Sequence, residues 1–349
     1  SPYAVASVLQ NWLFLVPQGL TRRRSVVFLS LTGLLMLLYI HVPFCSTRCR
    51  YCAFHSSPLG RGVDAASSPA VRDYVDTLFM ELAHWGDQLG GSEVQSVFFG
   101  GGTPSLLSPR IIGLTMERIN KYFKLAPKAE VTLEANPESL RGGHRAAQYL
   151  DAGINRLSIG VQSMDEGMLR LLGRPHKAQD SLHVAFLARE AGCANINLDL
   201  MWGLPGQSVR QWLQTLKDVI RMAPDHISAY GLTLEPGTPF ELDVEEGRLT
   251  LPPERDQNIM FMEGAAMLEQ HGYLHYEISN FARMGFQCRH NMGYWEGEDY
   301  LGLGPSATST INNRRWTNPS SQAAWNARTR EGKLAQSVEE LTPETRVLE

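Results

Sequence analysis

Short apolar segments bounded by glycine and proline alternate with longer amphipathic segments along most of this chain. The apolar segments predict strands at Leu35–His41, Val94–Phe99, Glu130–Glu134, Arg156–Val161, Asn195–Met201 and His226–Tyr230. The amphipathic segments predict helices at Val71–Leu89, Pro109–Phe123, Ser139–Ala152, Ala178–Ala191 and Ser208–Met222. Because a helix separates each pair of successive strands, the strands are expected to run parallel. We therefore expect an α/β fold whose sheet is closed, or nearly closed, into a barrel, with an open doubly wound sheet as the alternative.

Residues with known preferences at helix ends agree with these boundaries. Ser108 followed by Pro109 is typical of a helix start, and Gly153 and Gly192 are typical of helix stops. Beyond residue 241 the alternation gives way to one helix, expected at Arg255–His271, and a stretch rich in Gly, Asn and Trp over residues 286–318. We therefore expect a core barrel over residues 36–241 and a smaller C-terminal accessory region over residues 242–349.

The first part of the chain differs from the rest in charge. Residues 1–35 contain no acidic residue, and the segment from Ser25 to Val42 carries no charge. Its length suits a membrane helix or a signal sequence. However, the segment runs without a cleavage site into the strand predicted at Leu35–His41, which a membrane helix would consume. We expect residues 1–35 to lie upstream of the functional protein, with a membrane anchor as the alternative.

The composition excludes one class of protein and argues against another. Hydrophobic residues make up 43% of the chain and charged residues 19%, so a large core can form and global disorder is excluded. The formal net charge of -4 argues against a surface that coats nucleic acid.

Three cysteines, Cys45, Cys49 and Cys52, lie in one short loop after the first predicted strand. The chain has five cysteines in 349 residues, too few for a disulfide scaffold, so a metal or cluster site in a reduced compartment is the better interpretation. Three thiolates suit a four-iron cluster that keeps one iron open. The alternative is a structural zinc site with His41 or His55 as the fourth ligand. The two cysteines that stand alone, and that we expect to be structural, are Cys193 and Cys288.

Glycine and polar residues follow the other predicted strands at their carboxyl ends, which meet on one rim of a parallel barrel. Gly101 and Gly102 follow the second strand, and their bare backbone can approach a ligand closely. Glu134 and Asp199 lie at the ends of two further strands, and two carboxylates on one rim suit hydroxyl and ammonium groups. Taken singly, each of these features also has an interpretation without a ligand. The glycines could be no more than a turn, and each carboxylate could be a helix cap or a polar group at the rim of the core.

Five motifs occur in order along the chain, at Tyr39–Cys45, Gly100–Pro104, Ser158–Ser163, Leu172–His176 and Asp199–Gly206. With the C-x3-C-x2-C cysteine spacing, they resemble the radical S-adenosylmethionine (radical SAM) superfamily, and more closely its oxygen-independent coproporphyrinogen oxidase-like family. The resemblance runs from about Met36 to the end of the chain. It implies a partial six-stranded (βα) barrel of TIM-like form, consistent with the strand count. It also implies an incomplete accessory region, because relatives continue into a small helical domain.

The resemblance implies roles for individual residues. Cys45, Cys49 and Cys52 would bind a [4Fe–4S] cluster whose open iron takes S-adenosylmethionine. Nine residues would bind S-adenosylmethionine, namely Tyr39, Tyr51, Gly101, Gly102, Thr103, Glu134, Gln162, Arg174 and Asp199. Among them, Glu134 is suited to accept hydrogen bonds from ribose hydroxyls and Arg174 to pair with a carboxylate.

Two branches of this family differ at a few positions. The pattern of the oxidases has a fourth cysteine two positions after the third, whereas this chain has Phe54 at that position. The haem chaperones resemble this chain at an H-N-x-x-Y-W pattern, in which His290 is our candidate haem ligand beside Tyr294 and Trp295. Thr308 stands where many relatives have a histidine, so a second histidine facing the porphyrin is missing there.

We therefore predict a cytoplasmic haem chaperone that uses a [4Fe–4S] cluster, S-adenosylmethionine and haem. The expected partners are haem, an unidentified haem-acceptor protein and an electron donor. No nucleic acid is expected, and membrane contact is expected only through the acceptor. An oxygen-independent coproporphyrinogen III oxidase is the first alternative, and a zinc-binding structural module is the second.

Overall fold

The structure is a computed structural model that describes residues 35–60, 64–142, 144–335 and 337–346. The sequence predicts an upstream segment over residues 1–35, with a membrane anchor as the alternative. Both predictions lie outside the described residues, which include only Leu35 of this range. Among the residues that are described, no helix combines the length and the apolar character that a bilayer crossing requires.

All six predicted strands are confirmed, and they form the parallel centre of one sheet. They are β1 (Leu35–Val42), β4 (Glu93–Gly101), β5 (Lys124–Ala135), β6 (Arg156–Gln162), β7 (Ile196–Trp202) and β8 (His226–Gly231). Their order in the sheet follows their order in the sequence without reversal. A doubly wound sheet would reverse its order at a switch point, so this winding is that of a barrel. The barrel is partial, because β1 and β8 each pair on their other side with a different strand, β11 and β10 respectively.

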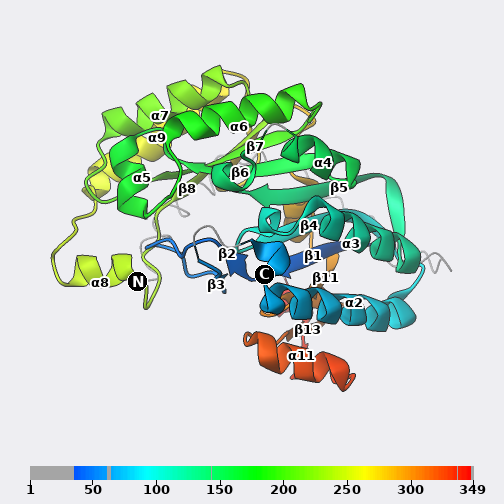
Figure 1. The fold of residues 1–349 in the computed structure, drawn as a ribbon. Helices are drawn as coiled ribbons and strands as arrows, with labels where there is room; N and C mark the ends of the chain where they lie inside the picture. The colour runs from blue at the N-terminus through cyan, green and yellow to red at the C-terminus, as the bar shows by residue number, and fades with distance from the viewer. Residues whose placement is uncertain (1–34, 61–63, 143, 336, 347–349) are drawn as a thin grey trace. The chain divides into compact units, whose positions relative to one another are not determined.

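The crossover helices cover the outer face of this sheet (Figure 1). They are α2 (Pro69–Leu89), α3 (Pro109–Tyr122), α4 (Arg145–Asp151), α6 (Ala178–Glu190) and α7 (Val209–Arg221). The predicted helix start is confirmed, because the Ser108 hydroxyl accepts a hydrogen bond from the Ile111 amide at 3.4 Å. The helix predicted from Ser139 is wrong in its first half. It begins only at Arg145, because Gly142 has a φ of +101°, which a helix cannot accommodate.

The remaining elements are short or belong to the C-terminal part of the chain. Around the first loops and crossovers lie β2 (Phe44–Cys45), β3 (Ser57–Pro58), α5 (Glu166–Leu172) and three 3-10 helices, η1 (Ala65–Ser67), η2 (Pro104–Leu106) and η3 (Pro137–Ser139). The C-terminal part holds α8 (Pro239–Glu245), α9 (Glu254–Gln270), β9 (Leu274–His275), β10 (Asn280–Ala282), α10 (Arg289–Trp295), β11 (Asp299–Leu303), β12 (Thr308–Ile311), β13 (Arg314–Thr317), α11 (Gln322–Arg330), β14 (Glu339–Glu340) and α12 (Pro343–Arg346). The helix predicted at Arg255–His271 is α9, shifted by one residue.

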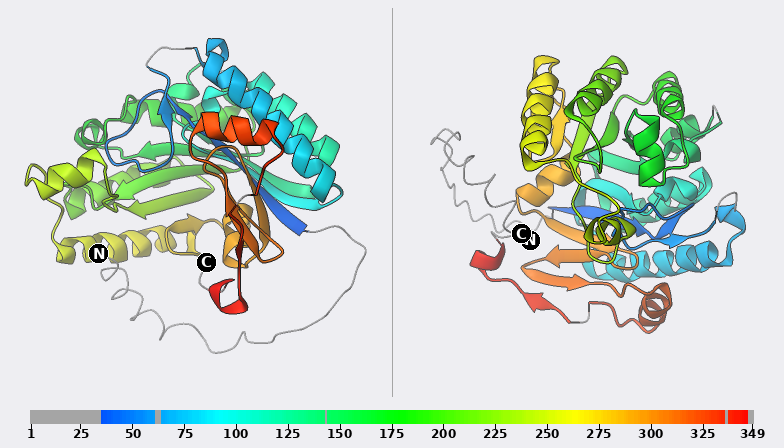
Figure 2. Two further views of the ribbon diagram at one scale, coloured as in Figure 1. Left: turned by 90° about the horizontal axis from the view of Figure 1, so that it is seen from below. Right: turned by 90° about the vertical axis from the view of Figure 1, so that its left-hand side faces the viewer.

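The C-terminal strands extend both edges of the central sheet. Strand β11 pairs in parallel with β1, and β12 to β14 continue the sheet beyond it, as the orange and red strands in Figure 2 show. At the other edge, β10 and β9 add to β8. The described residues all belong to one compact unit. The division at residue 241 therefore stays a prediction made from the sequence.

Alternate residues of the central strands face opposite sides of the sheet. On β6, Leu157 and Ile159 are fully buried in the apolar core, whereas Ser158 and Gly160 line a pocket inside the barrel. The barrel interior is therefore polar at its carboxyl end.

A buried carboxylate joins α2 to the C-terminal part of the chain. Glu81 is fully buried and accepts hydrogen bonds from the Gly304 amide at 2.8 Å, the Asn318 side-chain amide at 2.7 Å and the Trp325 indole at 3.1 Å. Burial raises the pKa of Glu81 to about 7, and the three hydrogen bonds oppose that rise. The C-terminal segments are thus held to α2 by a group whose charge is costly to bury.

We expect Glu81 to make the stability of the protein depend on pH. The folded-state pKa of about 7 lies above the ordinary value of 4.5, so the folded state binds the proton more tightly than the unfolded state. The free energy of unfolding should therefore fall as the pH rises through this window. In Glu81→Gln that fall should be reduced, whereas Asp76→Asn, on the exposed face of the same helix, should keep it. Chemical denaturation across the window measures this, and equal pH slopes in wild type and Glu81→Gln would contradict it.

Candidate functional site

A pocket of about 390 Å³ lies at the carboxyl ends of the parallel strands. Its volume is in the range of small-molecule sites. The predicted site residues that the structure brings together in its wall are Cys45, Cys49, Tyr51, Cys52, Gly101, Gly102, Thr103, Glu134, Gln162, Arg174 and Asp199. Two predicted site residues, Tyr39 and His290, do not line it.

The cysteine loop is held in place by backbone hydrogen bonds at both ends. Strand β2, which ends at Cys45, pairs with β3, and the Leu59 amide donates to the Cys45 carbonyl at 2.8 Å. Burial raises the pKa values of the Cys45 and Cys52 thiols, and the neighbouring Cys49 thiol raises both further. All three thiols line the same pocket. Among the described residues, no three Cys, His, Asp or Glu side chains already surround one metal-sized point.

The glycine turn after β4 is joined to the cysteine loop through the backbone. The Gly102 amide donates to the Val42 carbonyl at 2.8 Å, and the Thr103 amide donates to the Phe44 carbonyl at 2.7 Å. A Cβ atom on Gly102 would lie 2.5 Å from the Phe44 carbonyl oxygen and 3.0 Å from the Cys45 sulfur. Position 102 therefore accepts only glycine without displacing the loop. Gly101 has a φ of +112°, which a residue with a side chain rarely adopts.

Two carboxylates, those of Glu134 and Asp199, line the pocket near each other. Glu134 accepts a hydrogen bond from the Gly101 amide at 3.0 Å, and burial together with the nearby Asp199 raises its pKa to about 8. Burial also raises the pKa of Asp199, although Ser158 and Asn197 donate hydrogen bonds to it at 3.0 and 2.8 Å. A ligand whose hydroxyl or ammonium groups replace the lost hydration would favour the ionised, hydrogen-bond-accepting forms of both carboxyl groups.

Arg174 closes the side of the pocket next to the cysteines. Its guanidinium donates to the Gly160 carbonyl at 2.8 Å, to the Asn136 side chain and to the Cys49 sulfur at 3.5 Å. Its Nε atom is buried and has no hydrogen-bond partner among the described residues. A ligand with a carboxylate would supply the missing acceptor.

Gln162 enters the pocket because β6 is irregular at its end. The pairing of β6 with β7 shifts register between Gly160 and Gln162. Gln162 has a φ of 67°, a left-handed conformation that costs a residue with a Cβ about 1–2 kcal/mol. This bulge brings Gln162 into the pocket wall together with Gly160.

Helix α8 packs against the cysteine loop from outside the barrel. The Phe240 ring lies 6.3 Å from the Tyr51 ring, and the Phe240 amide donates to the Arg50 carbonyl at 3.2 Å. Arg50 also forms an ion pair with Asp243. The sequence analysis did not predict this helix, which fixes the loop residue Tyr51 in the pocket wall.

The two predicted residues outside the pocket lie together in an aromatic cluster deeper in the barrel. The ring centres of Tyr39 and His290 are 6.3 Å apart, with Phe98 5.1 Å from His290. His290 is 2% exposed, and its ring nitrogens contact Ser96 Oγ at 2.8 Å and Tyr294 Oη at 3.1 Å. Both nitrogens are thus engaged, and burial lowers the pKa of His290 to about 3. Thr308, which stands where many relatives have a histidine, forms a hydroxyl–hydroxyl hydrogen bond of 2.9 Å with Thr317 on the neighbouring strand.

The pocket wall also contains residues that the sequence analysis did not select, notably Asn136, Ser158 and Tyr230. A signal existed for each. Ser158 shares a strand face with Gly160 two residues later, and Asn136 follows Glu134 at the same strand end. Tyr230 lies at the end of β8, the strand end from which no residue was selected. Of the proposed zinc ligands, His41 has both ring nitrogens engaged, one with Tyr39 and one with a backbone carbonyl.

The sequence matches the radical SAM superfamily over residues 39–219, more than half of the chain. The chain belongs to the radical SAM superfamily. The match begins in β1 and ends in α7, so it covers the strands whose ends carry the cysteine loop, the glycine turn, Glu134, Gln162 and Asp199.

Similar proteins place this radical SAM chain in the HemN-like family, in the branch that contains the heme chaperones. It is 40% identical over 275 residues to the heme chaperone HemW of Escherichia coli, covering 78% of this chain and 70% of that protein. It is 43% identical over 270 residues to the mitochondrial radical S-adenosyl methionine domain-containing protein 1 of Bos taurus, covering 77% of this chain. The chain spans 59% of that relative's length. Among solved structures, it resembles coproporphyrinogen III oxidase (HemN) of Escherichia coli with a TM-score of 0.75 and 25% identity, covering 89% of this chain and 73% of that one.

We expect Gly102→Ala to destabilise the radical SAM fold at the glycine turn. The added methyl group would overlap the Phe44 carbonyl, so the loop must move, at a cost of about 1–3 kcal/mol in the free energy of unfolding. Gly113→Ala is the matched control. Gly113 is in helix α3 and its added Cβ would meet only ordinary contacts from 3.7 Å, so this variant should be about 0.5–1 kcal/mol more stable than wild type. Chemical denaturation compares them, and a Gly102→Ala variant as stable as wild type would contradict the geometry.

Proposed function

We propose that this protein is a radical SAM haem chaperone: it holds a [4Fe–4S] cluster and S-adenosylmethionine in the pocket, binds haem, and transfers the haem to an acceptor protein. The observation that carries the proposal is the similarity to proteins named heme chaperone HemW, of which this chain covers up to 72%. The pocket supports the cofactor part of the proposal, because it combines the cysteines, the glycine turn and the two carboxylates in one wall.

The residues of the pocket fit the proposed cofactors. Cys45, Cys49 and Cys52 are three thiols in one wall, the donor set of a cluster with one open iron. Gly102 lets the glycine turn pack closely against Cys45, and the buried Arg174 Nε lacks an acceptor that a methionine carboxylate supplies. When both are bound, the cluster and S-adenosylmethionine supply reductive cleavage of a carbon–sulfur bond, a chemistry that belongs to the cofactors.

The protein's own groups hold and orient this ligand. Gly101 and Gly102 present backbone to the methionine part, and the Thr103 hydroxyl donates to the Cys45 sulfur at 3.7 Å. Glu134 and Asp199 accept hydrogen bonds from hydroxyl and ammonium groups. Gln162 and Tyr51 complete the wall, whereas Tyr39, placed in this set by the family resemblance, supports the site from the aromatic cluster below.

Haem is proposed to use His290 as its iron ligand. Because burial keeps the imidazole neutral at physiological pH, it is in the form that binds iron. Ligation requires Tyr294 to release the Nε2 atom. Tyr294 is 40% exposed and Trp295 is 57% exposed, so both aromatic rings are accessible to a porphyrin face.

The oxidase alternative differs in the residue at position 54. Phe54 is 67% exposed and lines the pocket where the oxidase pattern has a fourth cysteine. An apolar ring there cannot supply a thiol, which supports the chaperone over the oxidase. The zinc module, the other alternative, is distinguished by metal content.

The proposed partners remain haem, an acceptor protein and an electron donor, with no nucleic acid and with a membrane reached only through the acceptor. The cytoplasmic location also stays a prediction, because the Bos taurus relative is named a mitochondrial protein.

We expect each of Cys45→Ser, Cys49→Ser and Cys52→Ser to abolish the cluster. A hydroxyl of similar size binds iron far more weakly than a thiolate. Cys193→Ser is the matched control, since Cys193 is buried near the opposite end of β7 and does not line the pocket. Iron and sulfide content after anaerobic reconstitution, with the visible absorption spectrum, measures the effect. A full cluster in any of the three loop variants would contradict the assignment, and bound zinc without iron would favour the structural module.

We expect reconstituted protein to shift the Soret band of added haem and to leave coproporphyrinogen III unconverted. His290→Ala should weaken or alter the haem band without changing the iron content of the cluster. His183→Ala, an exposed histidine on α6, is the control and should behave as wild type. Conversion of coproporphyrinogen III to protoporphyrinogen IX would favour the oxidase. An unaltered haem spectrum in His290→Ala would remove the ligand assignment alone.

A further inference from the structure

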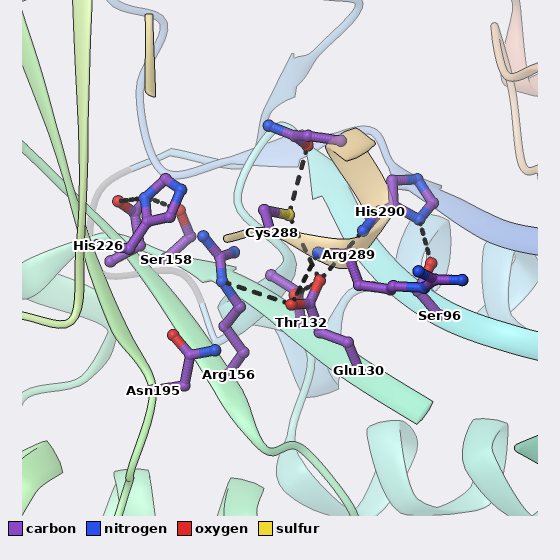
Figure 3. A network of polar contacts seen from close by, with 12 residues as sticks. Ser96, Glu130, Thr132, Arg156, Ser158, Asn195, His226, Cys288, Arg289 and His290 are labelled. Atoms are coloured by element: carbon purple, nitrogen blue, oxygen red, sulfur yellow. Dashed lines mark hydrogen bonds and ion pairs between the residues drawn. The ribbon is translucent and has the colours of Figure 1, made fainter. Parts of the chain in front are cut away.

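Arg156 lies inside the barrel, directly beneath the floor of the pocket. It is two residues before Ser158 on β6, so both side chains point into the interior, and Arg156 is 2% exposed (Figure 3). Ser158 lines the pocket and Arg156 does not. A permanent positive charge therefore lies one layer below the cofactor site.

One nitrogen atom of this guanidinium has no close partner. Its Nε atom is buried without a hydrogen bond, and the nearest ion pair among the described residues is to Glu130 at 4.0 Å. A buried charge that is incompletely paired often destabilises a fold relative to an apolar side chain of similar size. A purely structural role therefore explains Arg156 poorly, whereas an electrostatic role in the pocket above would explain why a charge is kept there.

The layer above Arg156 contains Ser158, which donates a hydrogen bond to a carboxylate of the pocket. The hydrogen bonds that hold Asp199 come from Ser158 and Asn197, both neutral donors, and Asn197 in turn contacts the His226 ring at 2.6 Å. These contacts fix the orientation of Asp199 without neutralising its charge. The positive charge of Arg156 lowers the pKa values of Asp199 and Glu134, opposing the rise that burial causes.

The neighbours below Arg156 hold the start of α10. Glu130 accepts hydrogen bonds from the Arg289 amide at 3.1 Å and the His290 amide at 3.3 Å, and its carboxylate also accepts from the Cys288 thiol at 3.4 Å (Figure 3). The Thr132 hydroxyl also donates to Glu130 at 3.4 Å, so Glu130 is fixed by four donors. It offers Arg156 a counter-charge that does not move.

We propose that Arg156 is a positioning residue for the cofactor site. It favours the ionised forms of Asp199 and Glu134, which accept hydrogen bonds from the hydroxyl and ammonium groups of S-adenosylmethionine, while Glu130 anchors it from below. This inference rests on the proposed binding of S-adenosylmethionine. Arg156 does not touch the ligand and acts only through the carboxylates. Other titratable groups that face this interior from the packed elements are Tyr39, His226, Tyr230, Tyr276, Cys288 and His290.

The test measures S-adenosylmethionine affinity against pH by calorimetry on the anaerobically reconstituted full chain. In Arg156→Met, the affinity near neutral pH should fall about tenfold or more, and the pH midpoint of binding should rise by about one unit. Raising the pH should restore much of the lost affinity, because the carboxylates then ionise without the guanidinium. Arg156→Lys, which keeps the charge, should retain most of the wild-type profile. Arg156→Gln carries the same test if circular dichroism shows that the methionine variant does not fold.

Arg189→Met is the matched control, because Arg189 pairs with Asp225 at 2.7 Å away from the pocket wall. The pH profile of Arg189→Met should therefore equal that of the wild type. The titration of the ligand itself contributes equally in every variant. Wild-type affinity in Arg156→Met, or a loss that is equal at every pH, would overturn the positioning role alone. Absence of S-adenosylmethionine binding by the wild type would overturn the proposed function, and this inference with it.

Discussion

The backbone hydrogen bonds from Gly102 to Val42 and from Thr103 to Phe44 join the cysteine loop to the end of β4, and the rest of the site is arranged around this junction. They form only because β1 and β4 are adjacent parallel strands that end at the same level. Two segments about sixty residues apart in sequence thereby become one surface. The cysteines, the glycine turn and the carboxylates of the next strands then face one pocket.

Inside the barrel the polar side chains are arranged in two layers with different tasks. The upper layer, with Glu134 and Asp199, borders the pocket. In the lower layer, Arg156 and His290 are buried, and Glu130 bonds the start of α10. Burying so many polar groups is costly unless they bond one another or act on a ligand. Most of them are bonded, and Arg156 is the group whose charge remains available to the layer above.

The strands and their functional ends could be predicted from the sequence because both signals are local. An apolar run bounded by glycine identifies a strand, and the residues that follow a parallel strand lie on the rim. The pairing of β11 with β1 and the position of α10 inside the barrel could not be predicted, because they depend on contacts between distant segments. The burial of His290 is a consequence of that packing. The left-handed backbone at Gly142 explains the late start of α4, which helix periodicity does not reveal.

The central claim is that three thiolates leave one iron open beside the pocket that holds S-adenosylmethionine. The most direct measurement is the electron paramagnetic resonance spectrum of the reduced, reconstituted protein with and without S-adenosylmethionine. If the ligand binds the open iron, the g-values of the cluster signal should change on its addition. An identical spectrum with saturating S-adenosylmethionine would contradict the account.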